Sequence, residues 1–239
     1  FGRKNKRLPV SYQRRSPYYW WWQYLRRNRA YLDCCEGDGK GSLASLYADF
    51  GDVREDNFHR WWTEGGRGVH LFAERPLTIN FCELESPADW QPHWTKDTAM
   101  VLVVPLRVSK RRLKGVFAKY LDSRHGGKKS GRPSMAAMMS VSTARYKLEH
   151  NYTIAGLANA LAVYDEWTKN QSSPASQRLT LWQIAEKLNL NRSAIKDAVS
   201  ANKQDRMTGR NTLAATVSRY VRQAGTMIEN TSLGRFPAM

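Results

Sequence analysis

The chain reads Leu179-Thr-Leu-Trp-Gln-Ile-Ala-Glu-Lys-Leu-Asn-Leu-Asn-Arg-Ser-Ala-Ile-Lys-Asp-Ala-Val-Ser-Ala201 near its C-terminus, and this stretch determines the fold expected there. Thr180 suits the N-cap of a first helix, and Gln183, three residues on, suits the other half of a capping box. The apolar residues that follow share one face at helical spacing: Ile184, Ala185 and Leu188. Asn189 tolerates the left-handed backbone that a tight turn needs. The pattern therefore predicts a helix, a turn and a second helix.

The second helix is expected over residues 192–201, with Asn191 or Ser193 as its cap. It would bury Ile195, Ala198 and Val199. Residues 180–201 resemble the helix-turn-helix of DNA-binding regulators in their inward residues, their small residue and their turn residue: Ile184, Leu188, Leu190, Ile195, Ala198, Ala185 and Asn189. The family commonly has glycine at the turn, so Asn189 is a departure. The resemblance implies that the second helix enters the major groove of DNA.

The same resemblance implies a set of DNA-contacting side chains on the second helix and just after it: Arg192, Ser193, Lys196, Ser200, Lys203, Arg206 and Arg210. Residues 204–211 are polar and are expected to form a loop, in the manner of a small wing beside the groove. Residues 212–230 are expected to form a last helix. It either packs on the preceding helices or pairs with a second subunit, which makes a homodimer one of the expected partners.

Charge is segregated along the 239 residues, which carry a net charge of +17. Residues 1–30 hold nine Lys or Arg and no acid, and residues 31–100 hold thirteen acids against six bases. Residues 101–150 return to twelve bases against two acids. Blocks of this kind are typical of surfaces that contact a polyanion, most often nucleic acid.

Three basic segments are expected to contact phosphates: an extended arm at 1–16, a helix at 109–121 and a glycine-rich loop at 125–133. The alternatives for the arm and the loop are a solubilising tail and a plain linker. The residues expected to contact the phosphate backbone are Arg3, Lys4, Lys6, Arg7, Arg14, Arg15, Lys110, Arg111, Lys114, Lys128, Lys129 and Arg132.

The segment after the arm predicts a buried aromatic core. Ser16 and Pro17 suit the cap and first position of a helix, and aromatic residues in 18–24 cover all of its faces. Stacking of these rings on unpaired bases is the alternative. Stretches at 69–74, 77–84 and 100–108 have strand-like composition. The fold class expected is therefore α+β: a small Trp-rich mixed domain (17–124), a flexible linker (125–144) and an all-helical domain with the helix-turn-helix (145–239).

Residues 22–31, Trp-Gln-Tyr-Leu-Arg-Arg-Asn-Arg-Ala-Tyr, resemble the Trp-x-x-Leu-Arg-Arg-Asn segment of uncharacterised regulator-like proteins of proteobacterial mobile elements. This resemblance implies a bacterial plasmid, phage or genomic-island context. Together with the helix-turn-helix, it favours a non-catalytic DNA-binding regulator or accessory factor. The alternative is a nucleic-acid-binding subunit of a larger ribonucleoprotein or anti-phage defence assembly. Duplex DNA is the favoured partner and RNA stays open; the Trp-rich domain is a candidate surface for a protein partner.

Catalytic patterns are weak in this sequence. The five histidines are scattered, and the nuclease alternative rests on Glu74, Glu83 and Glu85, none of which is followed by Lys at the spacing such a site uses. Asp49, Asp52, Glu55 and Asp56 are expected to stabilise a turn. Three cysteines without zinc spacing predict no disulfide framework and no metal site. No apolar run approaches a membrane span. We therefore expect a cytoplasmic protein without catalytic residues, cofactor or membrane contact.

Overall fold

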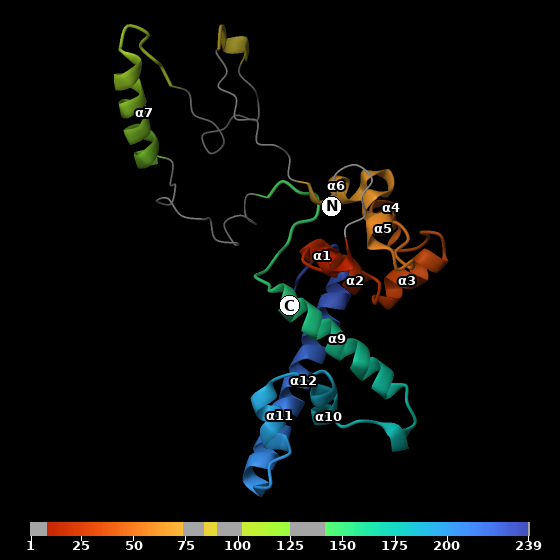
Figure 1. The fold of residues 1–239 in the computed structure, drawn as a ribbon. Helices are drawn as coiled ribbons and strands as arrows, with labels where there is room; N and C mark the ends of the chain where they lie inside the picture. The colour runs from red at the N-terminus through yellow and green to blue at the C-terminus, as the bar shows by residue number, and fades with distance from the viewer. Residues whose placement is uncertain (1–8, 74–83, 90–101, 125–141, 239) are drawn as a thin grey trace. The chain divides into compact units, whose positions relative to one another are not determined.

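The computed structural model describes residues 9–73, 84–89, 102–124 and 142–238 (Figure 1). The chain forms two compact units, one from residues 1–75 with 135–239 and one from residues 76–134. The helices of the first unit are α1 (Val10–Gln13), α2 (Pro17–Leu25), α3 (Arg29–Glu36), α4 (Ala44–Phe50), α5 (Phe58–Thr63), η1 (Glu64–Gly66), α6 (Arg67–Phe72), α9 (Ile154–Gln171), η3 (Ala175–Gln177), α10 (Leu181–Lys187), α11 (Arg192–Ala198) and α12 (Lys203–Thr231). The described part of the second unit holds η2 (Pro87–Asp89) and α7 (Lys110–Arg124).

Helix α2 begins as its sequence predicts. The Ser16 Oγ accepts a hydrogen bond from the backbone N–H of Tyr18 at 3.2 Å, and Pro17 occupies the first helical position. Trp21, Trp22 and Tyr24 are fully buried on this helix. The interpretation of the aromatic run as core, rather than as a platform for bases, is confirmed.

An aromatic core surrounds α2. The centre of the Trp21 ring lies 5.3 to 6.1 Å from the centres of four other rings, which belong to Phe50, Phe72, Tyr146 and Phe236. Edge and tilted contacts of this kind add to the free energy gained by burying the rings. Because Phe236 comes from the C-terminal end of the chain, the core joins both ends of the sequence.

The expected α+β class is wrong. The described residues form helices and no strand or sheet, and the β-type pairing among them is an isolated bridge between Leu148 and Phe236. Residues 69–74, expected as a strand, lie mostly in α6. Gly68, Leu71 and Phe72 bury one helical face there, so tertiary packing overrides the strand propensity of the segment. Residues 102–108 form no strand, and most of the stretch 77–84 lies outside the described residues.

Hydrogen bonds join helices that the sequence analysis assigns to separate domains. The Tyr24 hydroxyl donates to the carbonyl oxygen of Leu157 at 3.0 Å, and the Asn28 amide donates to the carbonyl oxygen of Ile228 at 2.7 Å. These bonds join the N-terminal helices to α9 and α12. The Trp-x-x-Leu-Arg-Arg-Asn segment therefore has a structural role, since its Trp22, Leu25 and Asn28 are all buried.

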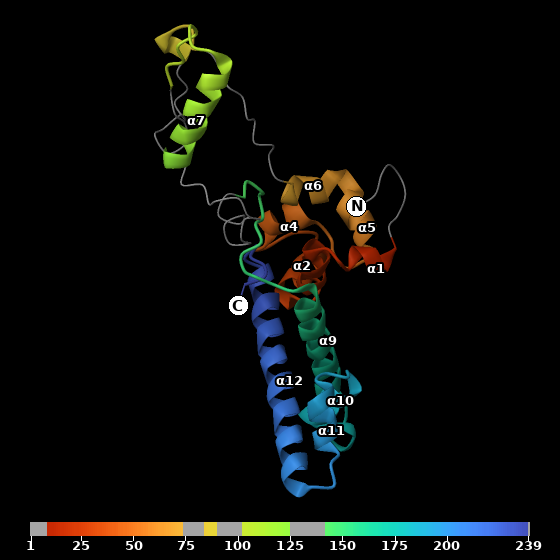
Figure 2. The ribbon, with the colours of Figure 1, turned by 60° about the vertical axis from the view of Figure 1, so that its left-hand side comes forward.

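Helices α9 and α12 run side by side, and α10 and α11 pack against them (Figure 2). A second buried cluster lies here and contains Val163, Ile184, Leu190, Leu213 and Val217. The loop expected at residues 204–211 is wrong, because α12 begins at Lys203 and continues for 29 residues. The Asn202 Oδ1 caps it by accepting from the N–H of Gln204 at 2.9 Å. The wing is therefore replaced by a continuous helix.

No helix among the described residues has the length and apolarity needed to cross a bilayer.

Candidate nucleic-acid interface

Local interactions fix the pair of helices α10 and α11. The Gln183 Oε1 accepts from the backbone N–H of Thr180 at 2.8 Å, as expected for a capping box. Asn189 has φ 51°, so the expected left-handed turn residue is confirmed. Asn191, also left-handed at φ 53°, caps α11 through its Oδ1, which accepts from the N–H of Ala194 at 3.3 Å. The four residues between Lys187 and Arg192 therefore form the turn that separates the two helices.

Helix α11 faces the long helix with its smallest residues. Ala194 and Ala198 are buried and Ile195 is half-buried. Val199, expected to be buried, is 62% exposed because α11 ends at Ala198. The inward face of α11 is thus made of alanines, which permit a close approach to α12.

Gly209 is the residue of α12 that accepts this approach. A Cβ atom placed on Gly209 would lie 2.8 Å from the carbonyl oxygen of Ala194 and 2.7 Å from the carbonyl carbon of Asp197, and would also overlap the backbone nitrogen of Ala198. These are backbone atoms, which cannot rotate away. The absence of a side chain at Gly209 therefore sets the position of α11 on α12.

Two of the predicted DNA-contacting residues hold the end of α11. The Arg206 Nη1 donates to the carbonyl oxygen of Ser200 at 3.1 Å, and the Arg210 Nε donates to the carbonyl oxygen of Ala198 at 3.2 Å. The Arg210 guanidinium also lies 4.5 Å from the centre of the Trp182 ring on α10. Both side chains are half-buried. Their contacts are structural, since they satisfy carbonyl groups at a helix end.

The other predicted contact residues fall into two groups. Arg192, Ser193, Lys196 and Lys203 are exposed on α11 and at the start of α12, and Ser200 is half-buried after α11. Ser193 donates to the Asn191 Oδ1 at 2.9 Å. Arg192, Lys196 and Lys203 make no ion pair within the described residues. They present cationic groups to solvent on one short helix and the adjacent helix start.

Sequence reasoning missed two cations farther along α12. Arg219 and Arg222 are exposed and, like Arg192, make no ion pair within the described part of the chain. Arg219 lies beside the turn that contains Asn189 and Asn191, because all three line one hollow of the surface. Both arginines lie off the apolar stripe of α12, which indicates exposure. The sequence carries no signal that Arg219 lies near the turn.

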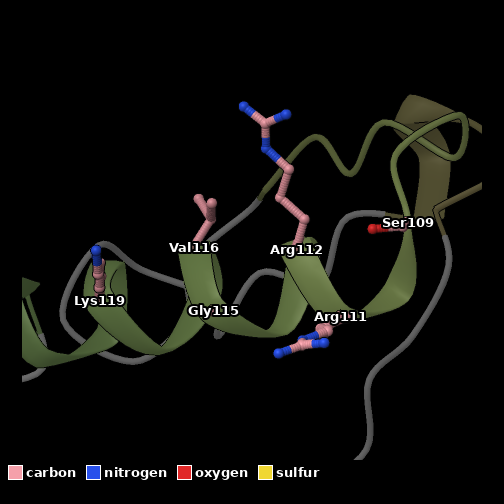
Figure 3. A pocket seen from close by; sticks show the side chains of 6 residues that line it. All are labelled: Ser109, Arg111, Arg112, Gly115, Val116 and Lys119. Carbon is pink, nitrogen blue, oxygen red and sulfur yellow. The ribbon is translucent and has the colours of Figure 1, made fainter.

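The second unit carries a basic surface on α7. Lys110, Arg111 and Lys114 are exposed there, as a phosphate contact requires. Figure 3 shows that the Arg111 and Arg112 side chains point away from each other, with Gly115 farther along the helix. A shallow hollow of about 410 Å³ lies over this glycine, and Ser109 and Lys119 also line it. Arg112 and Lys119 are therefore additional cations of this surface.

The arm and the glycine-rich loop are largely outside the described residues. Arg3, Lys4, Lys6 and Arg7 precede the described part, and Lys128, Lys129 and Arg132 fall between its last two segments. Arg14 and Arg15 are described and exposed. The Arg14 carbonyl accepts from the Trp20 indole N–H at 2.8 Å, and the Arg15 guanidinium lies 5.6 Å from the Tyr12 ring centre.

The acidic turn is neutralised by arginines. Asp52 pairs with Arg54 at 2.6 Å, and hydrogen bonding from Arg54 lowers the pKa of the Asp52 carboxyl. Three further pairs involve the same acidic stretch: Glu55 with Arg60, Asp56 with Arg26, and Asp49 with Arg145. The described residues contain no group of three or more His, Cys, Asp or Glu arranged to hold a metal ion. Of the glutamates considered for a nuclease, Glu74 and Glu83 lie outside the described residues.

No protein-family model matches this chain, and neither the comparison with curated proteins nor that with solved structures returns a significant match.

Proposed function

We propose that this protein is a non-catalytic DNA-binding protein that reads duplex DNA with α11. One observation carries the proposal: the cations of α11 and α12 make no ion pairs within the described residues, although Asp197, Asp205 and Glu229 belong to the same segment. Unpaired exposed cations keep their capacity to neutralise phosphates and to donate to guanine edges. The resemblance of residues 180–201 to a helix-turn-helix gives the reading role to this helix.

Two roles are assigned to the exposed cationic side chains, each unit being taken by itself. Arg192, Ser193 and Lys196 are the candidates for base contacts, because they are exposed at the start and middle of α11. Lys203 and the basic face of α7 are candidates for phosphate contacts, which position a protein without reading sequence. A regulator or accessory factor of a bacterial mobile element is the proposed context, supported only by the resemblance of residues 22–31.

The testing experiment compares two double variants that remove the same charge. Arg192→Ala with Lys196→Ala is expected to reduce the preference for the selected duplex over an unrelated duplex by about tenfold or more, because each base contact contributes about 1–3 kcal/mol of discrimination. Arg54→Ala with Arg60→Ala removes two salt-bridged arginines and is expected to change this preference less than twofold. The duplex is selected from a random pool with the unaltered protein, and affinities are measured by fluorescence anisotropy. Equal loss of preference in both variants would contradict the proposal.

A nucleic-acid-binding subunit of a larger assembly is the second candidate. The second unit favours it, since Val103 and Leu106 are 95% and 91% exposed close to the basic helix α7. Exposed apolar side chains beside cations suit a protein partner or a sequence-independent RNA contact. Full competition by RNA, together with equal weakening of all duplexes in the α11 variant, would favour this candidate over the regulator.

A further inference from the structure

A polar hollow of about 260 Å³ lies where the α10–α11 turn meets α9 and α12. Its polar lining comes from all three places: Asn159 on α9, Asn189 and Asn191 in the turn, and Thr216, Arg219 and Tyr220 on α12. No aspartate or glutamate lines it. Its lining includes Asn191, the residue that caps α11.

The hollow offers hydrogen-bond donors from one arginine and from side-chain amides, and it has no carboxylate. Arg219 lies with its guanidinium 5.5 Å from the Tyr220 ring centre and makes no ion pair among the described residues. The Asn191 Oδ1 is already used by Ser193 and Ala194, so the group that Asn191 has left for a ligand is its NH₂. The Thr216 hydroxyl donates to the carbonyl oxygen of Thr212 at 2.8 Å. The Arg219 guanidinium and the Asn191 NH₂ group are therefore donors left for a ligand, and with no carboxylate beside them they suit an anion.

The size of the hollow narrows the choice of anion. Pockets for drug-sized ligands measure about 300–1,000 Å³, so this one holds a smaller group. A guanidinium offers two parallel N–H donors, which match the oxygens of a phosphate. We propose that the hollow is a phosphate-binding site with Arg219 as its principal ligand. The assignment rests on the hollow itself and not on the function proposed above.

Two kinds of molecule carry a phosphate group that fits this site. It belongs either to the backbone of a DNA strand lying beside α11 or to a small phosphorylated molecule. In both cases the bound group connects the turn to α12. Tyr220 packs against both the aromatic core and the cluster around α10 and α11, so the site lies at the junction of the two.

The test uses Arg219→Ala, with Arg222→Ala as the matched control. Arg222 is exposed on the same helix and does not line the hollow, so both variants lose one charge at a surface position. Duplex affinity is measured against salt concentration. Inorganic phosphate is titrated at constant ionic strength, while the backbone amide resonances of residues 188–191 are followed by NMR.

If the source is DNA, Arg219→Ala weakens duplex binding about tenfold and lowers the log–log salt slope by about one, whereas Arg222→Ala changes the affinity less than threefold. If the source is a small molecule, phosphate shifts the amides of residues 188–191 in the unaltered protein and not in Arg219→Ala, with duplex affinity equal in the two variants. Arg219→Lys is expected to keep part of either effect, since it retains the charge without the fork.

The inference is overturned if Arg219→Ala and Arg222→Ala behave alike in both measurements. Its failure is separable from that of the proposed function. A protein that binds no duplex but shows phosphate-dependent shifts lost in Arg219→Ala supports the site and refutes DNA reading. If the Arg192→Ala, Lys196→Ala variant loses duplex preference and Arg219→Ala has no effect in either measurement, the result supports DNA reading and refutes the phosphate site.

Discussion

Residues 26–67 and residues 188–231 use their arginines in opposite ways. In the first region, six arginines each pair with a carboxylate: Arg26, Arg27, Arg29, Arg54, Arg60 and Arg67. In the second region no Lys or Arg forms an ion pair with any described residue. Both regions belong to the same compact unit and share the helix pair α9 and α12 as support.

The difference shows where the net charge of +17 is available to a partner. The carboxylate in an ion pair cancels part of the positive potential that a cation presents to a partner, whereas an unpaired exposed cation presents its full potential. We therefore expect changes in the first region to alter stability and changes in the second to alter binding.

Alkaline pH is expected to unfold the aromatic region. Burial is the main cause that raises the pKa of Tyr24, Tyr31 and Tyr146 above the ordinary value of 10.0. Because their folded pKa is the higher one, the stabilisation that these tyrosines provide is fully present below pH 10 and is lost as the pH rises beyond it. Absorbance of tyrosinate at 295 nm and helical circular dichroism, recorded together, should show these three groups ionising as the helices melt. Their ionisation with the helical signal intact would refute the prediction.

Gly209→Ala is expected to be the most damaging small substitution in the second region. The added methyl meets the backbone of α11, so we expect a loss of about 3 kcal/mol in the free energy of unfolding and weaker duplex binding. Gly225→Ala is the matched control on the same helix, where the nearest atom to the added Cβ is a Tyr164 ring carbon at 3.9 Å. Replacement of this glycine should stabilise the protein by up to about 1 kcal/mol. Urea denaturation of both variants measures the two changes, and equal stability would disprove the packing argument.

Local chemistry made part of this fold predictable. Ser16 with Pro17, Thr180 with Gln183, and the turn residue Asn189 act through neighbours in the sequence, so their roles follow from spacing alone. The burial of the aromatic run likewise follows from its all-round apolarity. These features gave correct helix starts and a correct turn.

Long-range backbone contacts made the rest unpredictable. The polar residues 204–211 carry almost no apolar signal, because α12 meets α11 there through the bare backbone of Gly209. Arg206 and Arg210 have the sequence signature of DNA contacts, but their carbonyl partners lie at the end of α11 and just after it, and become neighbours only in the folded chain. The carbonyl groups of Leu157 and Ile228, which join the two ends of the chain, have no signature in side-chain sequence. Charge and polarity therefore predict which side chains are exposed better than they predict the hydrogen-bond partners of those side chains.

Arg27→Ala tests the cost of a paired arginine. The Arg27 guanidinium donates to both Asp165 carboxylate oxygens at 2.6 and 2.7 Å, and connects the end of α2 to α9. Both side chains are partly exposed, so we expect a loss of about 1–2 kcal/mol of stability rather than the full cost of a buried pair. Arg192→Ala removes an unpaired cation and should change the free energy of unfolding by less than about 0.5 kcal/mol. Comparable thermal destabilisation of the two variants would remove the distinction between the regions.

The smallest expected effects come from Arg29 and Lys203, two exposed cations of equal charge that can be compared directly. Arg29 forms an i, i+4 pair with Asp33 at 2.9 Å on α3, and its removal should cost about 0.3–0.5 kcal/mol of stability with no change in duplex binding beyond a weak effect of net charge. Lys203→Ala should leave stability unchanged but lower the log–log salt slope of duplex binding by about one. Each variant thus serves as the control for the other in the same two assays. If both lower the slope equally, the unpaired state of the Lys203 ammonium has no bearing on binding, and the total charge of the chain accounts for its affinity.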